Sequence, residues 1–473
     1  MRKKFSYPKL MEYFEEISAI PRPSYHEDAI AEFLVAFAKT RGFSYLRDEW
    51  NNVLISAPAT EGLEDRTPVL LQGHTDMVCE KNEGVTHDFL RDPIALYEEN
   101  GWLRAKGTTL GADNGVAVAA MLSILDGEAH PPIECLFTSS EEVGLDGAKN
   151  FDYTKISART MINMDGADDG EIIVGCAGGA RSDLFLRGER MPCEDACYRL
   201  SIRGLAGGHS GEDIHRGRAN ANCLLGRLLS EILTEQEIRL ASVSGGNKDN
   251  AIPREASAVL WVKDFESAKQ AVDSVWQTIL GELCDEDSSA ELCFAPCERF
   301  GELFDAPMTG RLVNLLSAPN GVLAMEEKIP DLVQFSRNLG VIRTEEQGIK
   351  IIFSSRSAKD EQIDASLSEL DGYALRTDAE ITHHSRYPGW DIAEHSELRE
   401  KYAEVFRRLF GRELRIASIH AGLECGLIKQ ALPTMDLISC GPMIENLHSP
   451  DERLNLLSLE RFFLLITEML KTL

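Results

Sequence analysis

The sequence predicts an α/β fold, a mostly parallel sheet flanked by helices, interrupted by an α+β insert. Three observations support this prediction. Apolar strand patterns alternate with helix patterns over the first part of the chain, and polar residues follow several of these strands, as in open parallel sheets. The pattern changes after Gly175 and resumes at Ala379. We therefore expect one discontinuous domain, residues 1–180 and 376–473, around an insert of residues 181–375.

The elements of the first part follow one another in a regular order. Leu10, Phe14 and Ile17 share one face of an amphipathic helix, which Pro21 and Pro23 end. The further elements expected here are a helix at 27–37, strands at 52–55 and 69–71, a hairpin at 96–103, a helix at 116–125, and strands at 133–138 and 160–164.

The insert shows short alternating strands, for example 198–202, 258–262 and 349–353, with two or three amphipathic helices, one at 268–279. A strand, a glycine-containing turn and a long helix occur twice, but the similarity is too weak to count as a repeat. After the insert, the pattern predicts a helix near 398–409, a strand at 433–438 and a closing helix at 457–470.

Composition limits the possible functions. A chain of 473 residues with 43% hydrophobic residues is long enough for two or three domains. The net charge of -28 argues against nucleic acid as a partner. No apolar stretch is long enough for a signal peptide or a membrane span, so we expect a cytoplasmic protein without a membrane partner. The 11 cysteines, an odd and scattered set, do not indicate a disulfide framework or a structural zinc site.

The stretch from Val69 to Asp76 is the first candidate for a functional site. An apolar strand ends in His74, and Asp76 follows two residues later. Alternate side chains of an extended chain share one face, so these two residues can touch. A metal-binding imidazole commonly donates its other N–H to a carboxylate. The tripeptide alone is also compatible with a strand that simply ends in polar turn residues.

Other imidazoles and carboxylates lie where further strands are expected to end. The set is His74, Asp113, Glu141, Glu142, Asp165 and His448. Without cations their convergence would be prohibited by the repulsion of like charges, and two divalent metal ions would remove this cost. Mixed histidine and carboxylate ligands suit zinc, with manganese or cobalt as substitutes. Taken alone, Asp113 could also be the N-cap of the helix that follows it.

The adjacent pair Glu141 and Glu142 suggests a division of labour. Successive side chains leave the backbone in different directions, so one carboxylate can bind metal while the other faces water as a general base. Two metal ions roughly 3.5–4 Å apart can share a hydroxide and polarise a carbonyl. The pair alone could equally be a solvated turn.

These motifs resemble the co-catalytic zinc aminoacylase and carboxypeptidase superfamily, which includes carnosinases and tripeptide aminopeptidases. The matching stretches are 73–76, 111–115, 141–144, 163–165 and His448. Further stretches resemble the bacterial aminoacyl-histidine dipeptidases within that superfamily, nearly from end to end. These stretches are 20–24, 250–255, 354–357, 387–390 and 420–426.

The resemblance implies a zinc-peptidase-like fold and roles for single residues. His74 and Asp165 would bind one Zn2+, Glu142 and His448 would bind the other, and Asp113 would bridge both. Glu141 would be the general base, and Asp76 would orient His74.

The resemblance also implies that the insert is a lid or dimerisation domain, so a homodimer is expected. His209 would stabilise the tetrahedral intermediate, within one chain or across a dimer. Asn250 and Arg356 would hold the substrate, and Gly422 would offer a backbone contact. His209 could instead lie at the surface, Asn250 in a turn and Arg356 at a solvated edge. Glu212 stands where relatives are expected to have glycine, which leaves the pocket beside His209 in doubt.

The predicted function is hydrolysis of Xaa-His dipeptides such as β-alanyl-histidine, with a metal-bridging water activated by Glu141. Two other enzymes of the superfamily stay open as alternatives: a broader di- or tripeptidase and an N-acyl amino acid deacylase. A binding protein with a dead site is the alternative from another class, and metal content would distinguish it.

Overall fold

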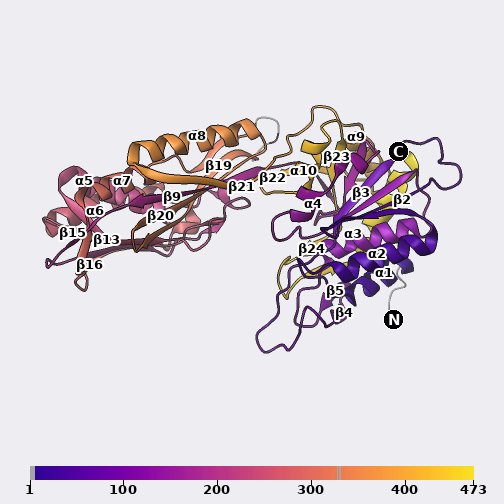
Figure 1. The fold of residues 1–473 in the computed structure, drawn as a ribbon, viewed down its shortest axis with the longest axis horizontal. Helices are drawn as coiled ribbons and strands as arrows, with labels where there is room; N and C mark the ends of the chain where they lie inside the picture. Colours follow the sequence, from indigo (N-terminus) through magenta and orange to yellow (C-terminus); the bar gives the residue numbers. More distant parts are fainter. Residues whose placement is uncertain (1–5, 327–328, 330–331) are drawn as a thin grey trace. The chain divides into compact units, whose positions relative to one another are not determined.

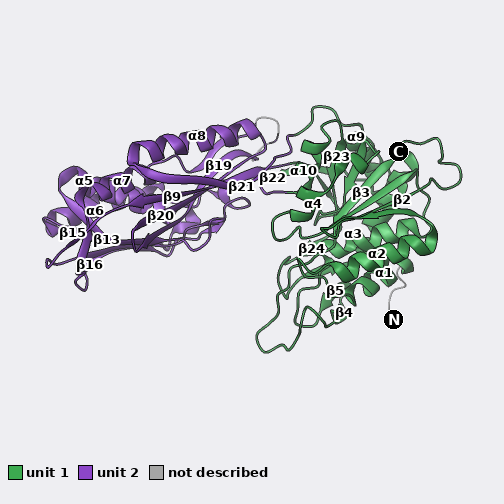
Figure 2. Cartoon of the chain, in the orientation of Figure 1, with its two compact units in different colours: residues 1–175, 392–418, 423–473 green, residues 176–391, 419–422 purple. Residues whose placement is uncertain are grey.

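The computed structural model describes residues 6–326, 329 and 332–473. The chain forms two compact units, coloured separately in Figure 2. Unit 1 contains the residues up to 175 together with 392–418 and 423–473. Unit 2 contains 176–391 and the short segment 419–422.

Unit 1 is built on an eight-stranded sheet of order β1-β2-β6-β3-β7-β23-β8-β22. The four central strands, β6, β3, β7 and β23, are parallel, whereas β1, β2 and β8 pair antiparallel with their neighbours. The sheet is therefore parallel at its centre, which is the part that carries the candidate ligands. In chain order the strands are β1 Ser44–Arg47, β2 Val53–Ala57, β3 Val69–His74, β6 Ile133–Thr138, β7 Thr160–Asn163, β8 Glu171–Cys176, β22 Arg415–Ile419 and β23 Asp436–Ser439.

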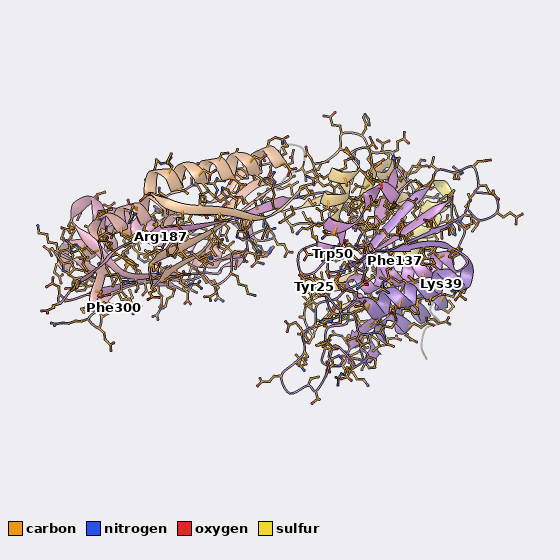
Figure 3. The ribbon with its side chains drawn as sticks, in the orientation of Figure 1. Tyr25, Lys39, Trp50, Phe137, Arg187 and Phe300 are labelled. Atoms are coloured by element: carbon orange, nitrogen blue, oxygen red, sulfur yellow. The ribbon has the colours of Figure 1, made fainter. Side chains whose placement is uncertain are left out.

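Helices cover this sheet, as Figure 1 shows. All six residues of β3 and of β6 are buried, so apolar side chains on both faces of these strands are covered. Phe137 of β6 is fully buried, whereas Lys39 of α2 is exposed (Figure 3). The helices are α1 Pro8–Ser18, α2 Asp28–Arg41, α3 Ala112–Leu125, α4 Asp146–Asn150, α9 Glu397–Phe410, α10 Glu424–Ala431 and α11 Leu456–Thr472, with a 3-10 helix at Tyr153–Lys155.

A small antiparallel sheet of order β24-β25-β5-β4 completes unit 1. Its hairpin of β4 and β5 is the one expected from the sequence. The strands are β4 Leu96–Glu99, β5 Trp102–Ala105, β24 Ile444–Glu445 and β25 Arg453–Asn455. Within the part of the chain that the structure describes, no helix has the length and apolar character needed to cross a membrane.

Unit 2 has an antiparallel sheet of order β16-β11-β15-β13-β19-β20-β9-β21, with β18 paired to β19. Four helices pack on it and enclose a second apolar core. The main strands are β9 Gly178–Arg187, β11 Tyr198–Arg203, β13 Ile238–Gly245, β15 Ala256–Val262, β16 Glu291–Pro296, β18 Gly321–Met325, β19 Val333–Glu345, β20 Gly348–Ser357 and β21 Ala379–Tyr387. The helices are α5 Ala221–Glu235, α6 Phe265–Glu282, α7 Ala306–Leu316 and α8 Asp360–Thr377. The short elements are β10 Arg190–Pro192, β12 Gly208–His209, β14 Ala251–Ile252, β17 Glu302–Phe304, and 3-10 helices at Ile214–Arg216 and Asp285–Asp287.

The sheet of unit 2 contains two halves with one topology. One half runs β11-α5-β13-β15-α6-β16 and the other β9-α7-β19-β20-α8-β21. In the sheet, β11 lies between β15 and β16, and β9 lies between β20 and β21, so the halves meet at the β13–β19 pair. Each half has the split βαββαβ arrangement. The repeat that was too weak to recognise in the sequence is thus present in the structure.

The fold class is confirmed, and two details of the sequence analysis differ from the structure. The units divide at residues 175 and 391 rather than at 180 and 375. Strand pairing explains the second boundary. We expected β21 in the second part of the first domain, but it pairs with β9 of unit 2. Among its described residues, the insert contains four α-helices where two or three were expected.

Candidate active site

The candidate ligands follow the ends of neighbouring parallel strands. His74 ends β3 and lies opposite Thr138, which ends β6. On the other side of β3, β7 ends at Asn163. Because these strands run in one direction, their carboxyl ends meet at one edge of the sheet. The loops that begin at this edge carry Glu141, Glu142 and Asp165.

His74 is the buried centre of the cluster, with 1% of the residue exposed. Its Nδ1 lies 3.3 Å from Oδ1 of Asp76, as the His-x-Asp spacing predicted. Its Nε2 lies 3.1 Å from Oδ1 of Asp113 and 3.5 Å from Oδ1 of Asp165. The ring therefore offers Nε2 to the site, while Nδ1 faces both the backbone carbonyl of Asp76, at 3.1 Å, and the Asp76 carboxylate.

Asp113 lies between two histidine rings. Its Oδ1 faces Nε2 of His74, and its Oδ2 lies 3.2 Å from Nε2 of His448. The backbone of Asp113 is non-helical, with φ -79° and ψ 108°, and no side chain makes a capping hydrogen bond at the start of α3. Both carboxylate oxygens of Asp113 face histidine rings instead. The position of Asp113 between the two rings is the geometry expected of a ligand shared by two cations.

The residues fit a metal ion. Single ligand atoms of His74, Asp113 and Glu142 all lie within 4.8 Å of one another. Oε2 of Glu142 is 3.2 Å from Nε2 of His448, while its Oε1 is buried without a hydrogen-bond partner. A buried carboxylate oxygen without a partner is costly unless a cation binds it. The donor set of imidazoles and carboxylates is one that zinc accepts.

The pKa values of the clustered groups also indicate that positive charge is favoured in the site. Burial raises the pKa of Glu141 well above its ordinary value, with Asp165 adding to the rise and His74 opposing it. Burial likewise raises the pKa of Asp165 to about 6. Burial lowers the pKa of His74, but Asp165 and Asp113 outweigh it and raise this pKa well above normal. Hydrogen bonds to Asp113 and then Glu142 raise the pKa of His448 to about 11. The raised pKa values of these two carboxyls and two imidazoles favour their protonated forms, and bound cations would displace such protons.

Glu141 lies at the edge of the cluster, with Oε2 4.0 Å from Nε2 of His74. Its backbone N–H donates to Oδ1 of Asp76 at 3.0 Å, and the N–H of Glu142 donates to Oδ2 of Asp76 at 3.2 Å. One buried carboxylate therefore orients both the His74 ring and the loop with the two glutamates.

Several buried residues of the site were not singled out from the sequence. Glu424 accepts from Nε2 of Gln72 at 2.5 Å and from Oγ1 of Thr138 at 2.8 Å, and Gln72 accepts from Nδ2 of Asn163 at 2.6 Å. This network links the ends of β3, β6 and β7. Glu424 lies in the stretch 420–426 that carried the family resemblance, which was the one available signal. Two more such residues, Arg22 and Glu452, bind the backbone of the ligand-bearing loops.

In unit 2, His209 lies on the short β12–β14 ladder, and Asn250 directly precedes β14. His209 is paired with Ala251, and the N–H of Ser210 donates to the carbonyl of Asn250 at 2.8 Å. Nδ1 of His209 accepts the backbone N–H of Glu212 at 3.1 Å. Its Nε2 therefore carries the proton in the neutral ring. Burial, then the charge of Arg356, lowers the pKa of His209.

The question raised by Glu212 is answered by this geometry. Its backbone holds the His209 ring, and the residue is exposed. A side chain at this position can therefore point into solvent without filling the space beside the ring.

Arg356 is buried, not at a solvated edge, with 9% of the residue exposed. Its Nη1 donates to Oη of Tyr387 at 2.9 Å, and its Nε has no hydrogen-bond partner. Gly422 lies against the same tyrosine, because a Cβ there would be 2.8 Å from the Tyr387 ring. Tyr387 stands in a stretch that resembles the family, but no role was predicted for this residue. These three residues form a group with spare donor capacity for an anion.

His420 has a structural partner within unit 2. Its Nε2 lies 2.7 Å from Oγ of Ser336. Burial, then the charge of Arg356, lowers the pKa of His420 to about 3. The ring is therefore neutral under ordinary conditions.

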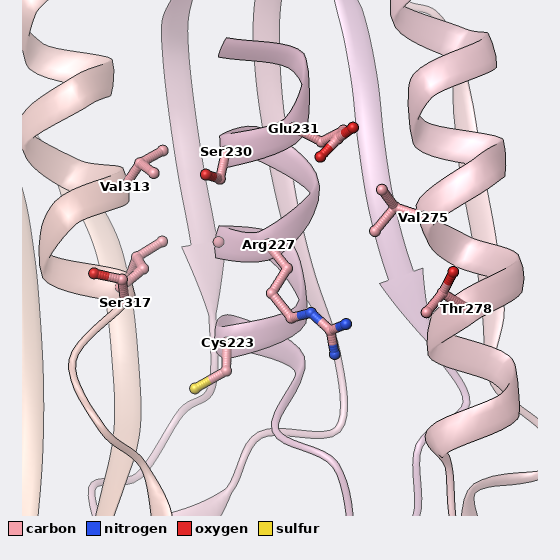
Figure 4. Close-up of a pocket in the computed structure, with 10 residues that line it drawn as sticks. Cys223, Arg227, Ser230, Glu231, Val275, Thr278, Val313 and Ser317 are labelled. Carbon is pink, nitrogen blue, oxygen red and sulfur yellow. The ribbon is translucent and has the colours of Figure 1, made fainter. Parts of the chain in front are cut away.

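Two surface pockets are lined by residues of unit 2. One, of about 340 Å3, lies between α5, α6 and α7 and is lined by Cys223, Arg227 and Val313 among others (Figure 4). The second, of about 850 Å3, is lined by parts of β11, β13 and β15. None of the predicted site residues lines either pocket.

Comparison with known proteins gives consistent matches over the whole chain. The chain is 39% identical over 469 residues to the cytosol non-specific dipeptidase of Escherichia coli (strain K12), covering 98% of this chain and 97% of the relative. It is similar in structure to the aminoacylhistidine dipeptidase of Vibrio alginolyticus, with a TM-score of 0.93 and 36% identity over 99% of this chain and 97% of that one.

A more distant structure and a family model extend the comparison. The aminopeptidase PepT of Bacillus cereus has a TM-score of 0.58 and 15% identity, with coverage of 99% of this chain and 98% of that one, which shows a shared fold. The model of Peptidase family M20/M25/M40 matches residues 70–472. The predicted enzyme class, a hydrolase of peptide bonds, is confirmed, and the chain belongs to Peptidase family M20/M25/M40.

Proposed function

We propose that the chain is a dipeptidase with two metal ions that hydrolyses Xaa-His dipeptides such as β-alanyl-histidine. The observation that carries the proposal is the position of Asp113 between His74 and His448, at 3.1 and 3.2 Å, beside further half-buried carboxylates. The name of the Vibrio alginolyticus relative, an aminoacylhistidine dipeptidase, supports the choice of substrate class.

Five residues would hold the two ions. His74 and Asp165 would bind one, Glu142 and His448 the other, and Asp113 both. Zinc suits this mixed set best, and manganese or cobalt would substitute. Bound ions would polarise the peptide carbonyl and lower the pKa of water. The fit of the donor set and the free Oε1 of Glu142 support this assignment.

Glu141 would act as the general base. It lies beside the proposed ligands, with Oε2 4.0 Å from Nε2 of His74. Burial favours its protonated form, so it can accept a proton from the attacking water and pass it to the leaving amine. Asp76 would keep the His74 tautomer and the Glu141 backbone in place.

Residues of unit 2 would bind the substrate. His209 would donate its Nε2 proton to the oxyanion, and Asn250 would donate to the same part of the substrate. Arg356 would bind the terminal carboxylate, for which its planar fork is suited, beside the backbone of Gly422. His209 and Arg356 belong to different halves of unit 2, yet Arg356 affects the pKa of His209. This supports a position of the two side chains close to each other within unit 2.

The proposal also covers the cellular location and the oligomeric state of the protein. The name of the Escherichia coli relative, a cytosol dipeptidase, supports a cytoplasmic location. A homodimer formed through unit 2 stays a prediction, which light scattering of the purified protein tests. If His209 acts within one chain, specific activity will not change on dilution below the dimer dissociation constant.

A broader dipeptidase is the second candidate, because the Escherichia coli relative is named non-specific. The test is the hydrolysis rate of β-alanyl-histidine beside alanyl-alanine, a tripeptide and an N-acetyl amino acid, with zinc and after chelation. Chelator-sensitive release of histidine, with the other substrates slow, supports the Xaa-His proposal. Comparable rates on both dipeptides would replace it with the broader one, and preference for the N-acetyl substrate would indicate a deacylase.

A further inference from the structure

Three ligand-bearing segments of unit 1 are far apart in sequence and meet at two buried charges. The segments are 74–76, 110–113 and 448–452. The first begins with His74, the second ends with Asp113, and the third begins with His448. The two charges are Arg22 and Glu452, with 2% and 3% of each residue exposed.

Glu452 binds four consecutive backbone N–H groups. Oε2 accepts from Leu110 at 2.8 Å and Gly111 at 3.0 Å. Oε1 accepts from Ala112 at 2.8 Å and Asp113 at 3.3 Å. An ionised carboxylate is an acceptor at both oxygens, so it alone satisfies all four donors at the start of α3. Glu452 is also four residues after His448, so it ties the segment of one candidate ligand to the segment of another.

Arg22 binds the carbonyls of the same loops. Its Nη1 donates to the carbonyls of Thr75 at 2.8 Å and Asp76 at 3.1 Å, and its Nη2 donates to the carbonyl of Gly111 at 2.6 Å. The guanidinium therefore joins the segment after His74 to the loop before Asp113. Burial lowers the pKa of Arg22, and the charge of Glu452 is the largest opposing effect.

Gly111 lies where the two charges act on one short stretch of backbone. Its N–H binds Glu452 and its carbonyl binds Arg22. Its φ of 68° lies in the left-handed region, and a Cβ would be 2.6 Å from Nη2 of Arg22 and 2.7 Å from Sδ of Met77. Glycine is the residue that permits this close approach.

We propose that Arg22 and Glu452 are positioning residues that hold the three segments in the metal-binding geometry before any metal arrives. The inference rests on the metal ligands assigned under the proposed function. Neither side chain is among the proposed metal ligands or substrate-binding residues. Their effect passes through the backbone of Gly111 to Asp113, the residue between the two histidines. Outer residues that orient metal ligands typically change metal affinity by about 10- to 100-fold.

The first variant is Glu452→Gln, which keeps the size of the side chain but puts an NH2 group against two backbone N–H donors. The second is Arg22→Lys, which keeps the charge but cannot reach three carbonyls in the same planar arrangement. The matched control is Glu134→Gln. Glu134 is a buried carboxylate of unit 1 that accepts the backbone N–H groups of Ser157 and Ala158, away from the ligand segments.

The experiment uses the full chain and zinc as the probe. The zinc dissociation constant is measured by competition with a chromophoric chelator, and the melting temperature of the metal-free protein is measured in parallel. We expect Glu452→Gln and Arg22→Lys to raise the dissociation constant by about 10- to 100-fold. Glu134→Gln should leave the dissociation constant unchanged, whatever it does to the melting temperature.

The outcomes separate positioning from general stabilisation. If all three variants lower the melting temperature and none changes zinc affinity, the two residues only stabilise the fold and the inference is overturned. The same holds if Glu134→Gln weakens zinc as much as the other two variants. Arg22→Lys keeps the test decisive if Glu452→Gln does not fold. Wild-type protein that binds no zinc would instead refute the proposed function, on which this inference depends.

Discussion

Asp76 accepts the backbone N–H of Glu141 at 3.0 Å. The carboxylate that faces Nδ1 of His74 therefore also places the proposed general base. Its other oxygen accepts the N–H of Glu142 at 3.2 Å and the hydroxyl of Ser24 at 2.7 Å. With 0% of the residue exposed, these partners replace water completely. The metal-binding side and the proton-transfer side of the proposed site thus share one support.

Replacing Asp76 with asparagine tests this shared support. The amide has one acceptor oxygen, and its NH2 group would face backbone N–H donors. We expect zinc affinity and kcat each to fall by about 10- to 100-fold, because both His74 and the glutamate loop lose their anchor. Isothermal titration with zinc and steady-state kinetics measure the two effects. Ser24→Ala, which removes a single hydroxyl, is the control and should have a much smaller effect. Normal kcat in Asp76→Asn would argue against the shared support.

Replacing Glu141 with glutamine tests the general base. The amide keeps the shape but cannot accept a proton from water, so we expect kcat to fall by about 10²- to 10⁴-fold. Metal content, measured by mass spectrometry, should stay at the wild-type level, because Glu141 is not among the proposed ligands. Glu142→Gln is the matched neighbour, and it should lose metal as well as activity. Equal metal loss in both variants would mean that the two glutamates have been assigned the wrong roles.

Site residues that directly follow a strand could be predicted from the sequence. Site residues whose hydrogen-bond partners lie hundreds of residues away could not. His74, Glu141 and Asp165 follow apolar strands, and a strand end is visible in a short window of sequence. Glu424 is bound to Gln72 at 352 residues' separation, and Glu452 to Leu110 at 342. No periodicity records such contacts. These residues therefore shape the site through contacts that a local sequence pattern does not contain.

The fold shows the same division between local and distant information. The helices and strands expected in the first unit are present, including α3 and the β4–β5 hairpin. Other features depend on pairing between strands that are distant in sequence. They are the antiparallel direction of β2 and β8 and the assignment of β21 to unit 2. The repeat in unit 2 became visible only through the mirrored strand order, because the two halves share topology without a recognisable sequence pattern.

Replacing Arg356 tests recognition of the substrate carboxylate. A hydrogen bond to a charged group contributes about 1.5–3 kcal/mol, so Arg356→Met should raise KM for β-alanyl-histidine by about 10- to 100-fold. A substrate with a carboxamide in place of the terminal carboxylate is the sharper control. Wild-type enzyme should prefer the acid strongly, and Arg356→Met should show little preference. Tyr387→Phe, which removes only the acceptor of Nη1, should weaken the preference less. An unchanged preference in Arg356→Met would exclude this role.

The low pKa of His420 predicts loss of stability in acid. Burial, with Arg356, lowers this pKa from 6.5 to about 3, so between these values the unfolded chain binds a proton that the folded chain does not. Stability is therefore present above pH 6.5 and is lost as pH falls toward 3, by at most about 1.4 kcal/mol per pH unit for this one group. Denaturant unfolding of metal-free protein between pH 7 and 4.5 measures the slope, and metal-free conditions remove competition at the ligands. His420→Asn, which does not titrate, should show a shallower slope than wild type. Identical slopes would mean that His420 is protonated in the folded state, which its bond to Ser336 and its burial argue against.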